Sequence, residues 1–143
     1  MRESRRKSDL WESLWERVIY MPCDYDPYAL PTIDFVGGET QNLLFNVYSS
    51  GGKQPFNLSD CTASFAVVNF TNKTGKPLLT KLMEADNKNT NVLRVRLLPS
   101  ETMDLFGKYI YQITIKDSDG NVEIPKQGLL YITNNINKSF ISL

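Results

Sequence analysis

Two residue types on which many enzymes and metal sites depend are scarce in this sequence. It has no histidine and only two cysteines, Cys23 and Cys61, among 143 residues. Without histidine there is no Ser-His or Cys-His nucleophile pair, and two thiols without C-x-x-C spacing cannot complete a structural zinc site. We therefore expect no enzymatic activity, no metal site and no cofactor. A disulfide between the two cysteines is conceivable, but free thiols are favoured in a chain without a secretion signal.

An excess of one charge and a long apolar run are also absent. Sixteen basic residues balance sixteen acidic residues, so the chain lacks the positive surface that a nucleic-acid-binding protein needs. No run of 18 apolar residues occurs and charged residues open the sequence, which argues against a membrane span and a signal peptide. We expect neither nucleic acid nor a membrane as a partner, and a chain that stays in the cytosol before any assembly.

The residues that are present suffice for one folded domain. Apolar residues make up 41% of the sequence and aromatic residues 11%, which is too rich for a disordered chain. A chain of this length can also bury a sizeable core without disulfides. We divide it into an N-terminal helix with a proline-rich arm, residues 1–31, and a β-sandwich domain, residues 32–143.

Residues 8–20 are predicted to form an amphipathic helix, for which Ser8 or Asp9 can cap the start. Its apolar residues recur at helical spacing along one face: Leu10, Trp11, Leu14, Trp15, Val18 and Ile19. We interpret these six as docking residues for a partner or an identical subunit, because two tryptophans offer a large anchoring area. A helix folded back over an open end of the sheet explains the pattern equally well. A third interpretation is that the protein starts at Met21.

Residues 21–31 read MPCDYDPYALP, with three prolines in eleven residues. Proline fixes the backbone φ angle and disfavours helix in the residue before it, so we predict an extended segment. A solvated connector is favoured over an arm that lies across a neighbouring subunit.

From residue 32 onward, alternating apolar and polar residues predict about seven short strands. Two of these strands place alternate side chains on a buried face: Leu43, Phe45 and Val47 in residues 41–48, and Ala63, Phe65 and Val67 in residues 61–70. The others are expected at residues 76–83, at 92–98 and within 97–133. Short strands separated by turns predict an all-β fold, an antiparallel immunoglobulin-like β-sandwich. The tail, residues 134–143, is expected to add an edge strand or to reach a neighbour.

Leu105, Gly107 and Tyr109 form the clearest local motif, a turn that leads into a strand. Immunoglobulin-like sandwiches have a corner tyrosine in this context, with its hydroxyl bonded to upstream backbone, so we interpret the three residues as a structural corner. The alternative is a sugar-stacking role for Tyr109, Tyr111, Tyr48 or the Trp residues, as in a carbohydrate-binding module.

Asp117, Asp119 and Glu123 surround Gly120 and resemble a fragment of a calcium-binding loop. The full twelve-residue pattern is missing. A tight hairpin turn is the favoured interpretation, because Asp and Gly tolerate the dihedral angles that such a turn requires.

Several short elements together resemble a known family. They are Gly38-Glu39-Thr40, Pro55 with the NLSD of residues 57–60, Gly107-Lys108-Tyr109, and the DSDG of residues 117–120. With them, residues 32–133 resemble the N-terminal domain of phage baseplate upper proteins, an immunoglobulin-like domain. Those proteins continue into a coiled coil and a further domain, whereas this sequence stops at Leu143.

The resemblance implies a non-enzymatic component of a phage or prophage tail, assembled in the host cytoplasm and located in the virion. It also implies that the partners are other tail subunits and that the chain forms a homo-oligomer. Two other classes stay open: a carbohydrate-binding module or cell-surface adhesion domain, and an enzyme restricted to carboxylate chemistry.

Overall fold

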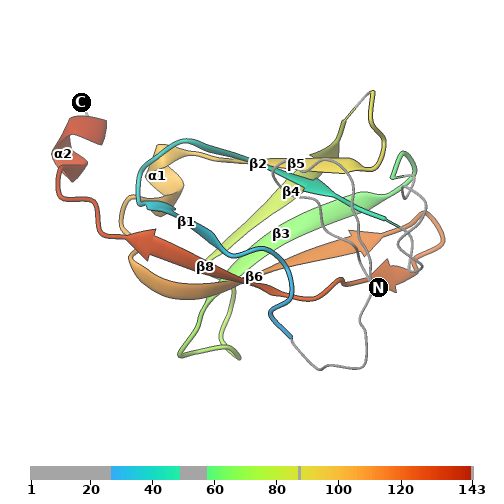
Figure 1. Ribbon diagram of the computed structural model, residues 1–143, viewed down its shortest axis with the longest axis horizontal. Coiled ribbons are helices and arrows are strands. Elements are labelled where there is room, and N and C mark those ends of the chain that lie inside the picture. The colour runs from blue at the N-terminus through green and yellow to red at the C-terminus, as the bar shows by residue number, and fades with distance from the viewer. Residues whose placement is uncertain (1–26, 49–57, 87, 143) are drawn as a thin grey trace.

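The computed structural model describes residues 27–48, 58–86 and 88–142. Within these residues the chain forms eight strands and two four-residue helices (Figure 1). They are β1 (Ile33–Val36), β2 (Gln41–Asn46), β3 (Thr62–Asn69), β4 (Leu79–Ala85), β5 (Val92–Leu97), α1 (Pro99–Thr102), β6 (Gly107–Lys116), β7 (Val122–Glu123), β8 (Gly128–Thr133) and α2 (Lys138–Ile141). The predicted all-β class is confirmed. The predicted helix of residues 8–20 lies outside the described residues.

The strands form one mixed sheet in the order β1-β8-β6-β3-β4-β5-β2, and β7 pairs with β6. Every pair is antiparallel except β1 with β8, which run in the same direction. The expectation of a wholly antiparallel sheet is therefore wrong at this edge. The reason is that the turn at Gly37 and Gly38 does not close a β1–β2 hairpin, because β2 pairs with β5 at the other end of the sheet.

The sheet curls so that its two ends form two layers, with β2 and β5 lying over β3 and β6 (Figure 1). The ring of Phe45 in β2 lies 6.4 Å from the ring of Phe65 in β3 and 5.8 Å from that of Tyr111 in β6. These contacts connect strands that are far apart in the sheet order. β2 pairs with β5 in one layer, and β6 pairs with both β3 and β8 in the other.

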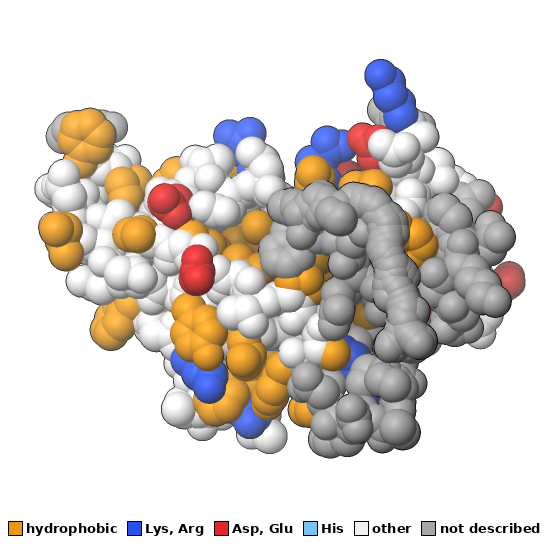
Figure 2. Space-filling view, viewed as in Figure 1, with side chains coloured by type: hydrophobic (Ala, Val, Ile, Leu, Met, Phe, Trp, Pro, Cys, Tyr) orange, Lys and Arg blue, Asp and Glu red, His pale blue; other side chains and the backbone are white. Residues whose placement is uncertain are grey.

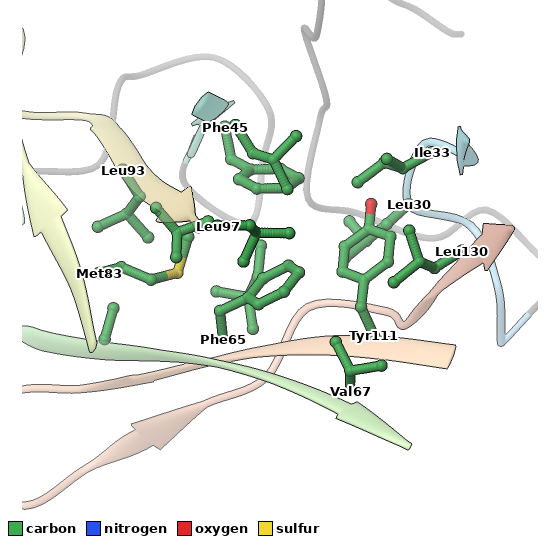
Figure 3. Close-up of a cluster of buried hydrophobic side chains, with 14 of the residues drawn as sticks. Leu30, Ile33, Phe45, Phe65, Val67, Met83, Leu93, Leu97, Tyr111 and Leu130 are labelled. Atoms are coloured by element: carbon green, nitrogen blue, oxygen red, sulfur yellow. The ribbon is translucent and has the colours of Figure 1, made fainter. Parts of the chain in front are cut away.

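The core lies between the two layers (Figure 3). The six residues predicted to face it from β2, β3 and the residue after β2 are all buried: Leu43, Phe45, Val47, Ala63, Phe65 and Val67. The ring of Tyr111 stacks on that of Phe65 at 5.5 Å, and its hydroxyl donates a hydrogen bond of 2.7 Å to the carbonyl of Pro31. Leu30 is also part of the core, so the described part of the proline-rich arm packs against the domain.

The corner between the layers lies in β4, which pairs with β3 along Leu79–Met83 and with β5 only through Glu84 and Ala85. Where β4 and β5 no longer pair, the ammonium group of Lys81 donates a 2.7 Å hydrogen bond to the carbonyl of Arg96 in β5. The same group forms a 2.9 Å ion pair with Glu101 of α1. Lys81 thus connects three elements at the corner.

Candidate docking surfaces

Asp117 and Asp119, from the segment that resembles part of a calcium-binding loop, lie in a hairpin turn. Asp117 accepts 2.9 Å hydrogen bonds from the backbone N–H groups of Asp119 and Asn121. The N–H of Asn121 contributes most to holding the pKa of Asp117 below its ordinary value. This is the geometry of a hairpin turn that an aspartate stabilises. In the described part of the chain, no group of three His, Cys, Asp or Glu residues could hold a metal ion.

Cys61 is a free thiol beside this turn. Burial raises the pKa of the Cys61 thiol, and the charges of Asp117 and Asp60 add to that rise. A thiol with a raised pKa is mostly protonated at neutral pH and is therefore a poor nucleophile. Cys23 lies outside the described residues.

The residues predicted to form the corner lie in the turn before β6 and at its start. The hydroxyl of Tyr109 donates a 2.9 Å hydrogen bond to the carbonyl of Phe106 and accepts one of 3.0 Å from the N–H of the same residue. Leu105 donates its N–H to the carbonyl of Thr102, and Gly107 has a φ of 119°. The energetic importance of the corner stays a prediction. Tyr109 and Tyr111 are both buried, so neither ring is available to stack on a sugar.

Two apolar side chains near the C-terminus face solvent. Ile136 is 96% exposed and Phe140 is 69% exposed. We call Ile136 and the residues of α2 (Lys138–Ile141) the α2 surface. It lies at the end of the molecule beside α1 (Figures 1 and 2). The expectation of a further edge strand in this tail is wrong, because residues 138–141 form a helix that packs on the β1–β2 turn.

The α2 surface is held in place by contacts of its neighbouring residues. The side chain of Asn135 donates a 2.6 Å hydrogen bond to the carbonyl of Gly37, and Lys138 forms an ion pair with Asp104 at 3.7 Å. Ile141 packs so closely on Gly38 that a Cβ atom there would lie 2.4 Å from its Cδ1 atom, and the φ of Gly38 is 93°. Only glycine meets both conditions without strain. The exposed Ile136 therefore lies next to the anchored Asn135, and the exposed Phe140 lies within α2, whose Ile141 packs on Gly38.

A second apolar surface covers part of the outer face of β3, β6 and β8. Ile110 lies on the outer face, because its neighbours Tyr109 and Tyr111 occupy the core side of β6. It is nevertheless only 3% exposed. Its ladder partners on the outer face are Val68 in β3 and Leu129 in β8. These three residues form an apolar row across the strands.

Aromatic rings and two lysines border this row. The rings of Tyr28 and Phe70 lie 6.1 Å apart. The ammonium of Lys108 lies 3.9 Å from the ring of Phe70 and 5.9 Å from that of Tyr131, while the ammonium of Lys73 lies 4.3 Å from the ring of Phe70. Such distances allow cation–π attraction. We call the eight residues the aromatic–lysine patch: Tyr28, Val68, Phe70, Lys73, Lys108, Ile110, Leu129 and Tyr131.

Figure 2 shows hydrophobic and basic side chains mixed on this part of the surface. Tyr131, at its rim, is 39% exposed. One carboxylate is near, because Asp34 of β1 is the ladder partner of Tyr131. Farther along the same face the residues are polar, as in the 2.8 Å hydrogen bond between Gln127 and Gln112. Leu82 of β4, the ladder partner of Ser64, is an exposed leucine on this face outside the aromatic–lysine patch.

Reasoning from sequence did not identify either surface. The docking residues proposed for the N-terminal helix, from Leu10 to Ile19, lie outside the described residues. One signal for the patch was present: Ile110 lies between two tyrosines that alternation assigns to the opposite face, and an apolar residue at such a position predicts a second buried face. The α2 surface had no comparable signal, because a four-residue helix is too short for helical periodicity.

Comparisons with known proteins relate the fold to one phage protein. No family model and no curated protein matches the sequence. The solved structure described as the N-terminal domain of phage TP901-1 ORF48 has a TM-score of 0.54 and 9% identity, covering 83% of this chain and 98% of that chain. CopC from Methylosinus trichosporium OB3b has a TM-score of 0.36 and 16% identity over 52% of this chain and 65% of its own, which is too little for any argument. None of the described helices is long and apolar enough to cross a membrane.

Proposed function

We propose that this chain is a non-enzymatic structural protein of a phage or prophage tail, a baseplate-type component that assembles in the host cytoplasm and becomes part of the virion. One observation is central: the fold resembles the N-terminal domain of phage TP901-1 ORF48 over 98% of that domain's length. The local motifs of residues 32–133, which resemble phage baseplate upper proteins, support the same class.

In this proposal the protein acts by contacts with other tail subunits, and copies of the chain contact one another. The α2 surface is the contact site that the geometry favours. It presents Ile136 and Phe140 to solvent on an element that is already fixed by Gly38 and Asn135. Binding there would order little additional chain, and exposed apolar side chains on a rigid element are typical of protein interfaces.

The test is deletion of the gene in the phage or prophage that encodes it, followed by complementation and electron microscopy of the particles. We expect the deletion to yield particles with absent or incomplete tails, and the wild-type gene to restore them. Complete, infectious particles from the deletion strain would refute the structural role.

A double variant, I136S/F140S, tests the contact site separately. Both side chains are exposed, so the variant should keep the wild-type circular dichroism spectrum while tail completion falls at least tenfold. The matched control is Leu82→Ser, which removes a leucine that is 79% exposed on β4, outside both surfaces. Wild-type assembly by the double variant would refute the α2 surface as the contact site but leave the structural role standing.

A further inference from the structure

The aromatic–lysine patch is a largely apolar surface on the outside of the sheet. It is distinct from the α2 surface to which the contact with other tail subunits is assigned. Ile110 is almost fully buried there, whereas Tyr131 at the rim is 39% exposed. The row of Val68, Ile110 and Leu129 is fixed by ladder pairing in β3, β6 and β8. The surface is thus rigid and has room for further apolar contacts at its rim.

The path of the chain indicates which segment can reach this surface. The described residues begin at Pro27, whose carbonyl accepts a 2.8 Å hydrogen bond from the N–H of Gln127 just before β8. Tyr28, the next residue, belongs to the patch through its ring contact with Phe70. The N-terminal segment therefore enters the domain at the border of the patch.

The amphipathic segment is attached there by a short connection. Residues 21–26 separate it from Pro27, and six residues span at most about 20 Å when extended. A segment tethered so closely has a high effective concentration at the patch, on the millimolar scale for short linkers. Its apolar stripe includes Trp11 and Trp15, whose rings suit a surface of aromatic and aliphatic side chains.

The charges of residues 8–20 complement those of the patch, while the four basic residues before them, Arg2, Arg5, Arg6 and Lys7, lie outside this predicted helix. Residues 8–20 contain three acidic residues, Asp9, Glu12 and Glu16, and one basic residue, Arg17. The patch has two lysines at its aromatic rings, with Asp34 as the one carboxylate identified beside it on β1. Lysine ammonium groups also attract tryptophan rings more strongly than other aromatic rings.

From these observations we infer that residues 8–20 bind the aromatic–lysine patch of their own chain. The apolar stripe lies against the side chains of the patch that are partly exposed: Tyr28, Val68, Phe70, Leu129 and Tyr131. Glu12 and Glu16 lie toward Lys73 and Lys108. This intramolecular contact is independent of any phage role, because it needs only the isolated chain.

Tryptophan fluorescence tests the inference directly, since Trp11 and Trp15 are the only two tryptophans in the sequence. In the purified full-length protein we expect blue-shifted emission and acrylamide quenching at least threefold weaker than for free tryptophan. The double variant F70S/Y131S should show red-shifted emission and a threefold rise in quenching. The matched control, Leu82→Ser, changes an exposed leucine on the same face but outside the patch, and should behave as wild type. Solvent-exposed tryptophans in the wild type would overturn the inference, and so would protection that the patch variant does not change.

A charge-exchange series distinguishes loss of the contact from unfolding of the patch variant. K73E/K108E changes two lysines at the surface and should raise quenching about twofold. Combining it with E12K/E16K should restore the wild-type value, which a merely destabilised domain would not do. Failure of this rescue, with all variants folded by circular dichroism, would overturn the charge pairing.

Light scattering at 5 and 500 µM distinguishes contact within one chain from exchange between copies. We expect the same fluorescence protection at both concentrations and in the monomer fraction. Protection that appears only as dimers form would show that a second copy supplies the segment, and would overturn the intramolecular assignment. Neither outcome depends on the presence of the chain in a virion.

Discussion

At the scale of single residues, the hydroxyl of Tyr109 makes two hydrogen bonds to one upstream residue, Phe106. The ring is buried and both hydrogen bonds are partly buried. We predict that Tyr109→Phe lowers the free energy of unfolding by about 1–2 kcal/mol. The control, Tyr131→Phe at the exposed rim of the patch, should change it by less than about 0.5 kcal/mol. Urea unfolding followed by circular dichroism measures both, and equal stabilities would show that the corner is dispensable.

Gly128 is a second residue on which the core depends. It is the ladder partner of Tyr111, and a Cβ atom there would lie 2.3 Å from the tyrosine ring. That ring cannot move away easily, because it stacks on Phe65 and its hydroxyl is bonded to Pro31. We predict that Gly128→Ala costs about 2–3 kcal/mol of stability through overpacking.

The double variant G128A/Y111L provides the check on this mechanism. Removing the ring should relieve the clash, so the two substitutions should cost less together than the sum of their separate costs. Gly75→Ala, in the exposed β3–β4 turn, serves as the control because its Cβ would meet only the flexible side chain of Asn72. A Gly128→Ala protein as stable as wild type would contradict the described packing.

At the scale of elements, Lys81 and Glu101 link β4, β5 and α1 at the corner of the sheet. Burial raises the pKa of Glu101, but the N–H of Leu98 and the ammonium of Lys81 together outweigh it, so the pKa lies below the ordinary value of 4.5. A carboxyl group with a lowered folded-state pKa stabilises the fold above its unfolded-state pKa, and this stabilisation is lost as the pH falls through the folded-state value.

Two results should follow for the free energy of unfolding. Lys81→Met should reduce it by about 1–2 kcal/mol at pH 7, whereas Lys76→Met, on the exposed β3–β4 connection, should change it little. The loss of stability between pH 5 and pH 3 should also be smaller for Lys81→Met than for wild type, because the other carboxyl groups titrate in both proteins. Identical acid profiles would show that the Lys81–Glu101 pair does not stabilise the corner.

The elements also show how far the sequence could predict the fold. Alternation correctly assigned the buried faces of β2 and β3, because each face is a local pattern of period two. The parallel β1–β8 pair was not predicted, since pairing between strands so distant in sequence depends on the whole topology. The predicted third strand, residues 76–83, is shifted to Leu79–Ala85, and Pro77, which lacks an N–H to donate to a ladder, lies before its start.

The candidate surfaces were harder to predict than the fold. The patch combines Tyr28 from the proline-rich arm with residues of β3, β6, β8 and the β3–β4 connection, so only the folded structure assembles it. The α2 surface depends on the packing of Ile141 against Gly38, which no local pattern encodes. The interpretation of Tyr109 as a corner residue could be made from the sequence, because the turn, the glycine and the tyrosine are close together in the chain.

At the scale of the whole molecule, the fold, the anchored α2 surface and the balanced charge are consistent with a subunit that works by contact with other proteins. We propose that this chain is a stoichiometric part of a phage or prophage tail. Quantitative mass spectrometry of gradient-purified particles tests it most directly. We predict that the chain is present at a constant ratio to the other structural proteins and remains after a high-salt wash. Its absence from complete, infectious particles would contradict the proposed role in the tail.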